Sequence, residues 1–141
     1  MKQLLIKAFT GINAFLIQIS HGMIGTRLGT QRVLLLRTRG RKTGKAHTTP
    51  IAYFDHEGSY LLVGSNWGRD YQADWFLNLV DHPAAKIELR GETIAVVAHS
   101  AGGEEYARLW RYATQRHPPY LAYQQMTRRP IPVVVLQPVA K

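Results

Sequence analysis

The chain has 141 residues, of which 45% are hydrophobic and 10% aromatic, and it contains no cysteine. That length suits one domain with a sizeable core, and the apolar content is too high for a disordered chain. The lack of cysteine excludes disulfide frameworks, thiolate nucleophiles and thiolate metal sites, and it is compatible with a cytoplasmic protein.

The net charge of +9 is concentrated in the first third of the chain. Nine Lys and Arg residues, from Lys2 to Lys45, precede Asp55, which is the first acidic residue. The charges of residues 55–141 sum to zero. We therefore expect an anionic partner to contact the first third of the chain.

Residues 1–24 are predicted to form an amphipathic helix, because Leu5, Phe9 and Leu16 fall on one apolar stripe. A lysine interrupts the apolar run and no small-residue cleavage site follows, so neither a signal peptide nor a spanning helix is predicted. Two roles remain open for this helix. It packs on the core or on the partner of a homodimer, or it makes a peripheral contact with a membrane surface. Residues 25–141 are expected to form a single domain.

Hydrophobic alternation and turn residues predict short strands and inserted helices from residue 31 onward. In chain order, we expect strands over 32–38, 48–54 and 59–64, a loop over 66–70, a helix over 73–80, strands over 85–89 and 92–99, helices over 104–116 and 120–126, and a strand over 133–136. Six short, mostly antiparallel strands with helices between them predict an α+β fold built on a small barrel, not a doubly wound sheet.

Several common site motifs are absent. The six histidines include no pair spaced for zinc, so we predict no metal site and expect each histidine to be structural or solvated. Ser65 lies next to Gly64, which is the wrong spacing for the nucleophile elbow of hydrolases. The glycines of residues 40–45 have the wrong spacing for a P-loop. Hydrolysis and nucleotide-triphosphate chemistry are therefore not favoured.

Four cations crowd the turn between the first two strands: Arg39, Arg41, Lys42 and Lys45. A hairpin can turn without them, so their mutual repulsion indicates a bound anion such as a phosphate or a polycarboxylate. Glycine backbone N–H groups, the Thr43 hydroxyl and a bidentate guanidinium would contact that anion. The alternative is a solvated, charged turn.

Tyr120 and Tyr123 follow a proline pair and lie three residues apart, so both phenols are expected on one side of a short helix. Their hydroxyls could donate a hydrogen bond or a proton to a ligand. Trp75 is at core spacing with Phe76 and Leu79, and core packing is expected for it.

Several short motifs follow one another at characteristic spacings. They are residues 39–44 with Thr49-Pro50, Ser65 with Gly68, residues 74–79 with His82-Pro83, Pro118-Pro119-Tyr120 with Tyr123-Gln124, and residues 131–136. Together, over about residues 31–138, they closely resemble the deazaflavin-dependent nitroreductase family. The resemblance implies a split β-barrel of the FMN-binding, pyridoxamine-phosphate-oxidase-like kind. It also implies coenzyme F420, a deazaflavin whose tail carries a phosphodiester and a polyglutamate chain.

The same resemblance implies site residues in several segments. Cofactor-binding residues would be Arg41, Lys42 and Thr43 at the phosphate and nearby carboxylates, His47, Thr48, Thr49, Pro50, Ile51, Ala52, Val63, Gly64, Ser65 and Asn66 along the deazaflavin, and Asp74, Trp75 and Asn78 at the short helix. Catalytic residues would be Tyr120, Ser65 and Tyr123, with Tyr120 or Ser65 stabilising or protonating an oxyanion. Many family members have Lys where this chain has Asn66, followed by Trp67, so we expect a weaker charge contact with the tail there.

The implied activity is hydride transfer from reduced F420 to an apolar electrophilic acceptor such as a quinone, an enone or a nitro compound. One alternative is a split barrel that binds deazaflavin, FMN or haem without catalysis. Another is a basic nucleic-acid-binding module with aromatic stacking platforms. The charge is gathered in a turn and an apolar helix and is not spread along a groove, so nucleic acid is the least favoured partner.

Overall fold

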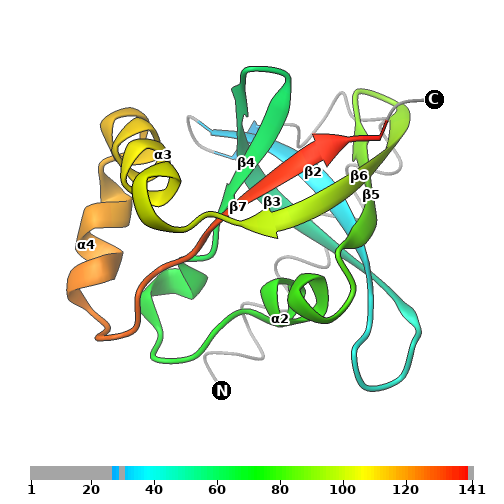
Figure 1. Cartoon of the computed structure of the whole chain (residues 1–141), viewed down its shortest axis with the longest axis horizontal. Coiled ribbons are helices and arrows are strands. Elements are labelled where there is room, and N and C mark those ends of the chain that lie inside the picture. The colour runs from blue at the N-terminus through cyan, green and yellow to red at the C-terminus, as the bar shows by residue number, and fades with distance from the viewer. Residues whose placement is uncertain (1–26, 29–30, 140–141) are drawn as a thin grey trace.

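The computed structural model describes residues 27–28 and 31–139, which form an antiparallel barrel with three α-helices (Figure 1). The predicted helix over residues 1–24 and the domain boundary after it lie outside the described residues. The elements are β1 (Arg27–Leu28), β2 (Gln31–Arg39), β3 (Ala46–His56), β4 (Ser59–Val63), the 3₁₀ helix η1 (Asn66–Gly68), α2 (Asp74–Asp81), β5 (Ala84–Leu89), β6 (Glu92–Ser100), α3 (Gly103–Arg116), α4 (Pro119–Gln125) and β7 (Val133–Pro138).

Six strands close on themselves in the order β2-β3-β4-β7-β6-β5, because β5 pairs back onto β2. Every pairing among the described strands is antiparallel. The predicted six-stranded barrel is therefore confirmed, and the two-residue β1, which the sequence did not indicate, pairs with the first two residues of β2.

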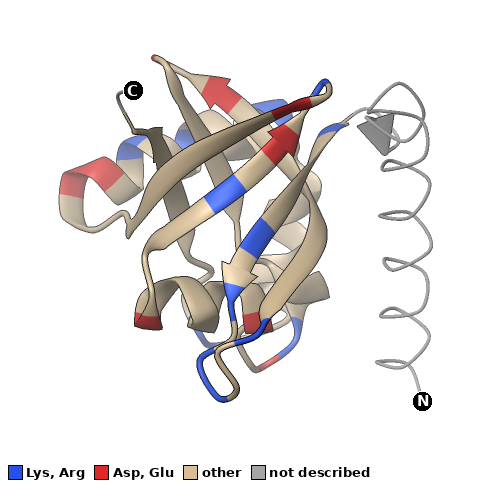
Figure 2. Ribbon diagram, turned by 90° about the vertical axis from the view of Figure 1, so that its right-hand side faces the viewer, with Lys and Arg blue, Asp and Glu red and all other residues tan. Residues whose placement is uncertain are grey.

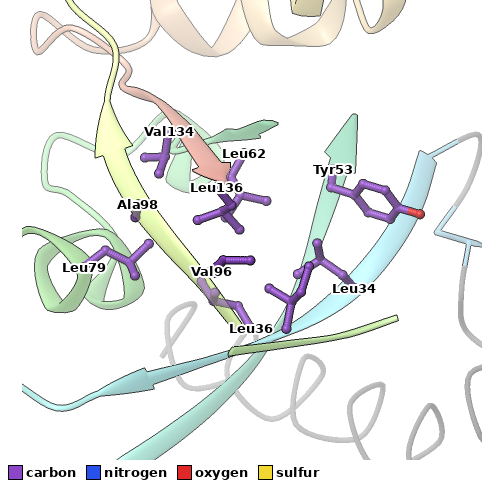
Figure 3. Close-up of a cluster of buried hydrophobic side chains, with 10 residues drawn as sticks. Leu34, Leu36, Tyr53, Leu62, Leu79, Val96, Ala98, Val134 and Leu136 are labelled. Carbon is purple, nitrogen blue, oxygen red and sulfur yellow. The ribbon is translucent and has the colours of Figure 1, made fainter. Parts of the chain in front are cut away.

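The core fills the inside of this barrel (Figure 3). Leu34 and Leu36 on β2 have no exposed surface and meet Tyr53, Leu62 and Leu136 from other strands. The intervening residues of β2, Val33 and Leu35, form a separate buried pair on its opposite face. Burial of both faces explains why β2 contains a continuous apolar run and not an alternating one.

The strands differ from the prediction mainly at their ends. β3 is longer than the predicted 48–54, because Ala46 pairs with Arg39 at one end and His56 pairs with Ser59 at the other. The next turn therefore shrinks to Glu57 and Gly58, both with positive φ (51° and 80°). Two-residue turns of this kind match the right-handed twist of the strands that they join.

The helices lie outside the barrel at two different places, α2 below it and α3 with α4 at the left in Figure 1. α2 packs against β2 and β6 and inserts Leu79 into the core. α3 and α4 lie together at another side, where Pro119 begins α4, a position that suits proline because its missing N–H would be unpaired there anyway. No helix in the described part of the chain is both long and apolar enough to cross a membrane.

Candidate functional site

A cleft of about 870 Å³ lies between the β2–β3 turn, residues 47–52 of β3, the loop after β4, α2 and α4. That volume is within the range of small-molecule and cofactor sites. Seventeen predicted site residues line it: Arg41, Lys42, Thr43, His47, Thr48, Thr49, Pro50, Ile51, Ala52, Val63, Ser65, Asn66, Asp74, Trp75, Asn78, Tyr120 and Tyr123. Gly64 does not line the cleft, because it packs against Pro132, whose Cγ would lie 2.7 Å from an added Cβ.

The basic turn forms one end of the cleft, and Figure 2 shows Lys and Arg gathered there at the bottom of the molecule. Gly40 N–H donates to Lys45 O and Gly44 N–H donates to Gly40 O, each at 2.8 Å. A Cβ on Gly40 would lie 2.6 Å from His47 Nε2, so glycine is needed for the imidazole to lie against the turn. Lys42 and Thr43 are exposed at the tip.

Asn78 fastens this turn to α2. Its Oδ1 accepts from the backbone N–H of Arg41 at 3.2 Å and from Arg41 Nη1 at 2.8 Å. Its Nδ2 donates to Thr38 Oγ1 at 3.4 Å, and Asn78 is 4% exposed. Arg41 Nη2 also lies 3.3 Å from Asp74 Oδ1. The Arg41 guanidinium is thus held in place at the cleft, and part of its charge is already paired.

Tyr120 supplies a buried hydroxyl in the cleft. It is 5% exposed, and its oxygen accepts a hydrogen bond from Gln31 Nε2 at 2.9 Å, which leaves the phenolic proton for another acceptor. Burial raises the pKa of Tyr120, so the phenol is protonated at neutral pH. The Tyr123 ring lies 6.4 Å from that of Tyr120 and 6.3 Å from that of Trp67.

The loop after β4 has an unusual backbone, with positive φ at Asn66, Trp67 and Gly68 (47°, 61° and 76°). Arg129 holds the loop. Its Nη2 donates to Ser65 O at 2.8 Å, its Nε to Arg69 O at 2.7 Å, and its Nη1 to Gly64 O at 3.3 Å and Gln72 Oε1 at 2.9 Å. Burial lowers the pKa of Arg129, an effect opposed by Asp70. The predicted site residue Ser65 is therefore positioned through its carbonyl.

Several residues that line the cleft were not among the predicted site residues. They are Gln31, Val33, Gly40, Trp67, Arg69, Tyr71, Gln72, Ala73 and His117. The prediction for His117 named only structural packing or solvent; its ring packs on that of Tyr120 at 4.8 Å in a T-shaped arrangement, and it also lines the cleft. Burial lowers the pKa of His117. The one sequence signal that could have placed His117 near the cleft is its position directly before the proline pair that precedes Tyr120. Trp75, expected in the core, both packs on the core and lines the cleft.

Known proteins resemble this chain in fold and in sequence. Residues 12–138 match the model of the F420H(2)-dependent quinone reductase family. The F420H(2)-dependent quinone reductase Rv1261c of Mycobacterium tuberculosis is 36% identical over 121 residues, which cover 83% of this chain and 81% of that protein.

Two solved structures extend the comparison. The F420-H2 dependent reductase FDR-A is 29% identical with a TM-score of 0.68, covering 74% of this chain and 93% of that one. A structure described as a domain-swapped dimer is 25% identical with a TM-score of 0.71, covering 93% and 98%. These matches confirm the expected split barrel and its cofactor class. The chain belongs to the F420H(2)-dependent quinone reductase family.

Proposed function

We propose that the cleft binds reduced F420 and positions a quinone for reduction beside Tyr120. Membership of the family makes the chain an F420-dependent oxidoreductase. The observation that carries the assignment of the site is that a single cleft joins a basic turn to a buried, protonated phenol.

The residues that line the cleft fit this cofactor. Arg41, Lys42 and Arg69 are cations and Asp74 is the one carboxylate among the described lining residues, so the lining has a positive balance that suits a polyanionic tail. Pro50, Ala52 and Val63 offer apolar surface for a planar ring. Thr43 Oγ1 accepts from Lys45 N–H at 3.2 Å, which leaves the threonine proton free for an anion at the turn.

When bound, the reduced cofactor supplies a hydride to an electrophilic acceptor. The protein orients the two reactants and stabilises the charge that develops on the acceptor oxygen. Tyr120 can donate from its hydroxyl to that oxygen, because Gln31 already occupies the lone-pair side. The rings of Trp67 and Tyr123 offer apolar surface to the acceptor, and Ser65 offers a second hydroxyl, since no described residue bonds its side chain.

Replacing Tyr120 by Phe tests this role. Loss of one such donor should lower kcat about 10²- to 10³-fold, with little change in the affinity for F420. Quinone-dependent oxidation of reduced F420 measures kcat, and fluorescence titration measures affinity. Tyr60→Phe is the matched control, because Tyr60 is half-buried, lies outside the cleft lining and has no hydrogen bond from its hydroxyl in the described structure. Equal turnover in Tyr120→Phe and wild type would contradict the role.

Two other outcomes would support one of the alternative functions. Tight binding of F420 with no oxidation by any quinone, enone or nitro compound would favour a storage or carrier protein. Displacement of F420 by single-stranded DNA would favour the nucleic-acid reading, which predicts a marked loss of affinity with salt.

We also propose a homodimer, with a domain-swapped dimer among the similar structures as support. A peripheral membrane contact through residues 1–24 is the competing role for that segment. Sedimentation of the full chain and of a chain lacking residues 1–24, with and without anionic liposomes, separates the two. Loss of the dimer on truncation favours the subunit contact, and loss of liposome binding favours the membrane contact.

A further inference from the structure

Arg69 is a cation of the cleft that no sequence motif predicted. It follows η1, is half-buried, and lines the cleft beside Trp67 and Tyr71. Its Nη1 lies 3.4 Å from Asn66 Oδ1, and its guanidinium carbon lies 5.9 Å from the centre of the Tyr71 ring. Its Nη2 is buried and has no hydrogen-bond partner among the residues that the structure describes.

A buried donor without a partner is costly, and charged donors most of all. Native proteins pair such groups nearly always, so an unpaired one beside a cleft points to a ligand that completes the pairing. Arg69 already lines the cleft, so a change in its side-chain torsion angles is the movement that would bring Nη2 to a ligand there.

The neighbouring arginines cannot supply this contact. The guanidinium of Arg129 already donates to three carbonyl oxygens and to Gln72 Oε1. Arg41 belongs to the basic turn and is paired with Asp74 and Asn78. Asp70 is the nearest acidic residue in sequence, and no ion pair joins it to Arg69 among the described contacts.

We propose that Arg69 is a second anion-binding residue of the cleft and binds a phosphate or carboxylate oxygen of the cofactor tail. This inference rests on the proposed binding of F420 in the cleft. Asn66 orients the guanidinium through Nη1, so that Nη2 is the donor left for the ligand. A guanidinium keeps its charge at all physiological pH values and pairs best with a permanent anion, which the tail carries and a neutral quinone does not.

The arrangement also accounts for the residue at position 66. Asn66 cannot provide a charge, and its Nδ2 donates to Tyr71 O at 3.0 Å within the loop. The positive charge is instead supplied three residues later, by a side chain that Asn66 itself contacts. Two cationic groups on separate segments, the turn and this loop, suit a tail that carries several anions along its length.

The test compares two ligands, F420 and the deazaflavin that carries only its ribityl chain, without phosphate or glutamates. Arg69→Gln should weaken F420 binding about tenfold or more, because a charge-assisted bond is lost, and should leave binding of the tailless deazaflavin unchanged. The F420 affinity of Arg69→Gln should also fall less with added salt than that of the wild type. Arg69→Lys should recover part of the affinity for F420, since it restores the charge without the planar fork.

Arg108→Gln is the matched control, because it removes the same charge from an exposed position on α3 outside the cleft lining. Thermal unfolding of each variant checks that the fold is kept. Equal weakening of both deazaflavins would overturn the proposal, since Arg69 would then act on the ring or on the shape of the loop. Unchanged F420 binding with a raised KM for quinone would overturn it in favour of a substrate contact. Failure of the wild type to bind F420 at all would instead contradict the proposed function.

Discussion

Arg129 shows how one side chain can organise a site without lining it. It joins the segment before β7 to four acceptors in the loop after β4, among them Ser65 O and Gln72 Oε1. Arg129→Gln should cost about 1–3 kcal/mol of unfolding free energy, because carbonyl groups lose their charged donor. Urea denaturation measures this. Arg128→Gln, an exposed neighbour, should be close to neutral, and equal stability of the two variants would contradict this role.

His117 gives the stability a defined dependence on pH. Burial lowers the pKa of His117 below the ordinary value of 6.5. In acid, His117 is therefore protonated more readily in the unfolded chain than in the folded protein. This contribution is absent well above pH 6.5 and destabilises the fold as the pH falls below that value. His117→Asn should therefore lose less melting temperature than the wild type between about pH 7.5 and about pH 5.5. Equal losses, measured by thermal denaturation, would show that His117 makes no such contribution.

The site residues predicted from the sequence come mainly from segments that are continuous in the chain. Arg41 and Lys42 of the turn, residues 47–52 and Tyr120 were named from local motifs and from the family resemblance, and all of them line the cleft. Arg129 was not found, because its partners lie 57 to 65 residues away and no spacing records such a contact. Gln31 was missed for the same reason, since its contact with Tyr120 spans 89 residues.

Among the elements, α2 and the β2–β3 turn are joined by the buried amide of Asn78 and by the ion pair of Arg41 with Asp74. Asn78→Ala removes the acceptor of Arg41 and the donor to Thr38, and leaves buried groups unpaired. We expect a loss of about 1–3 kcal/mol in unfolding free energy together with weaker F420 binding, because Arg41 then keeps only its contacts with Asp74. Gln115→Ala, which removes an exposed amide from α3, should change neither. Full retention of both stability and affinity in Asn78→Ala would show that the amide does not organise the turn.

The elements themselves were largely predictable, because strand alternation, the turn at Arg90-Gly91 and the proline pair are local signals. Their ends were not. β3 gains residues at both ends from pairing with Arg39 and Ser59, which only the assembled sheet defines. The left-handed backbone at Trp67 had no sequence signal, since a bulky residue rarely adopts it without support from surrounding structure.

At the scale of the whole molecule, the barrel depends on β2, which pairs with both β3 and β5. Leu36, fully buried inside it, should cost about 2–5 kcal/mol when replaced by Ala. Val97 is 47% exposed on β6, and Val97→Ala should be nearly neutral. Chemical denaturation measures both, and a small loss in Leu36→Ala would contradict the central place of β2 in the core.

The concentration of charge in the first third of the chain acquires a specific meaning in the folded molecule. Arg41 and Lys42 reach one cleft, and Arg69, from the electrically neutral remainder of the chain, lines the same cleft. The sequence alone indicated an anion at the turn, but the position of Arg69 depends on the fold of the loop after β4.

The most direct test of the central claim is a fluorescence titration of the wild-type protein with F420 and, in parallel, with FMN at low and at high salt. We expect F420 to bind at least about tenfold more tightly than FMN, and its affinity to fall as salt screens the cations of the cleft. Binding of FMN as tight as that of F420, or F420 affinity that does not respond to salt, would contradict the central claim.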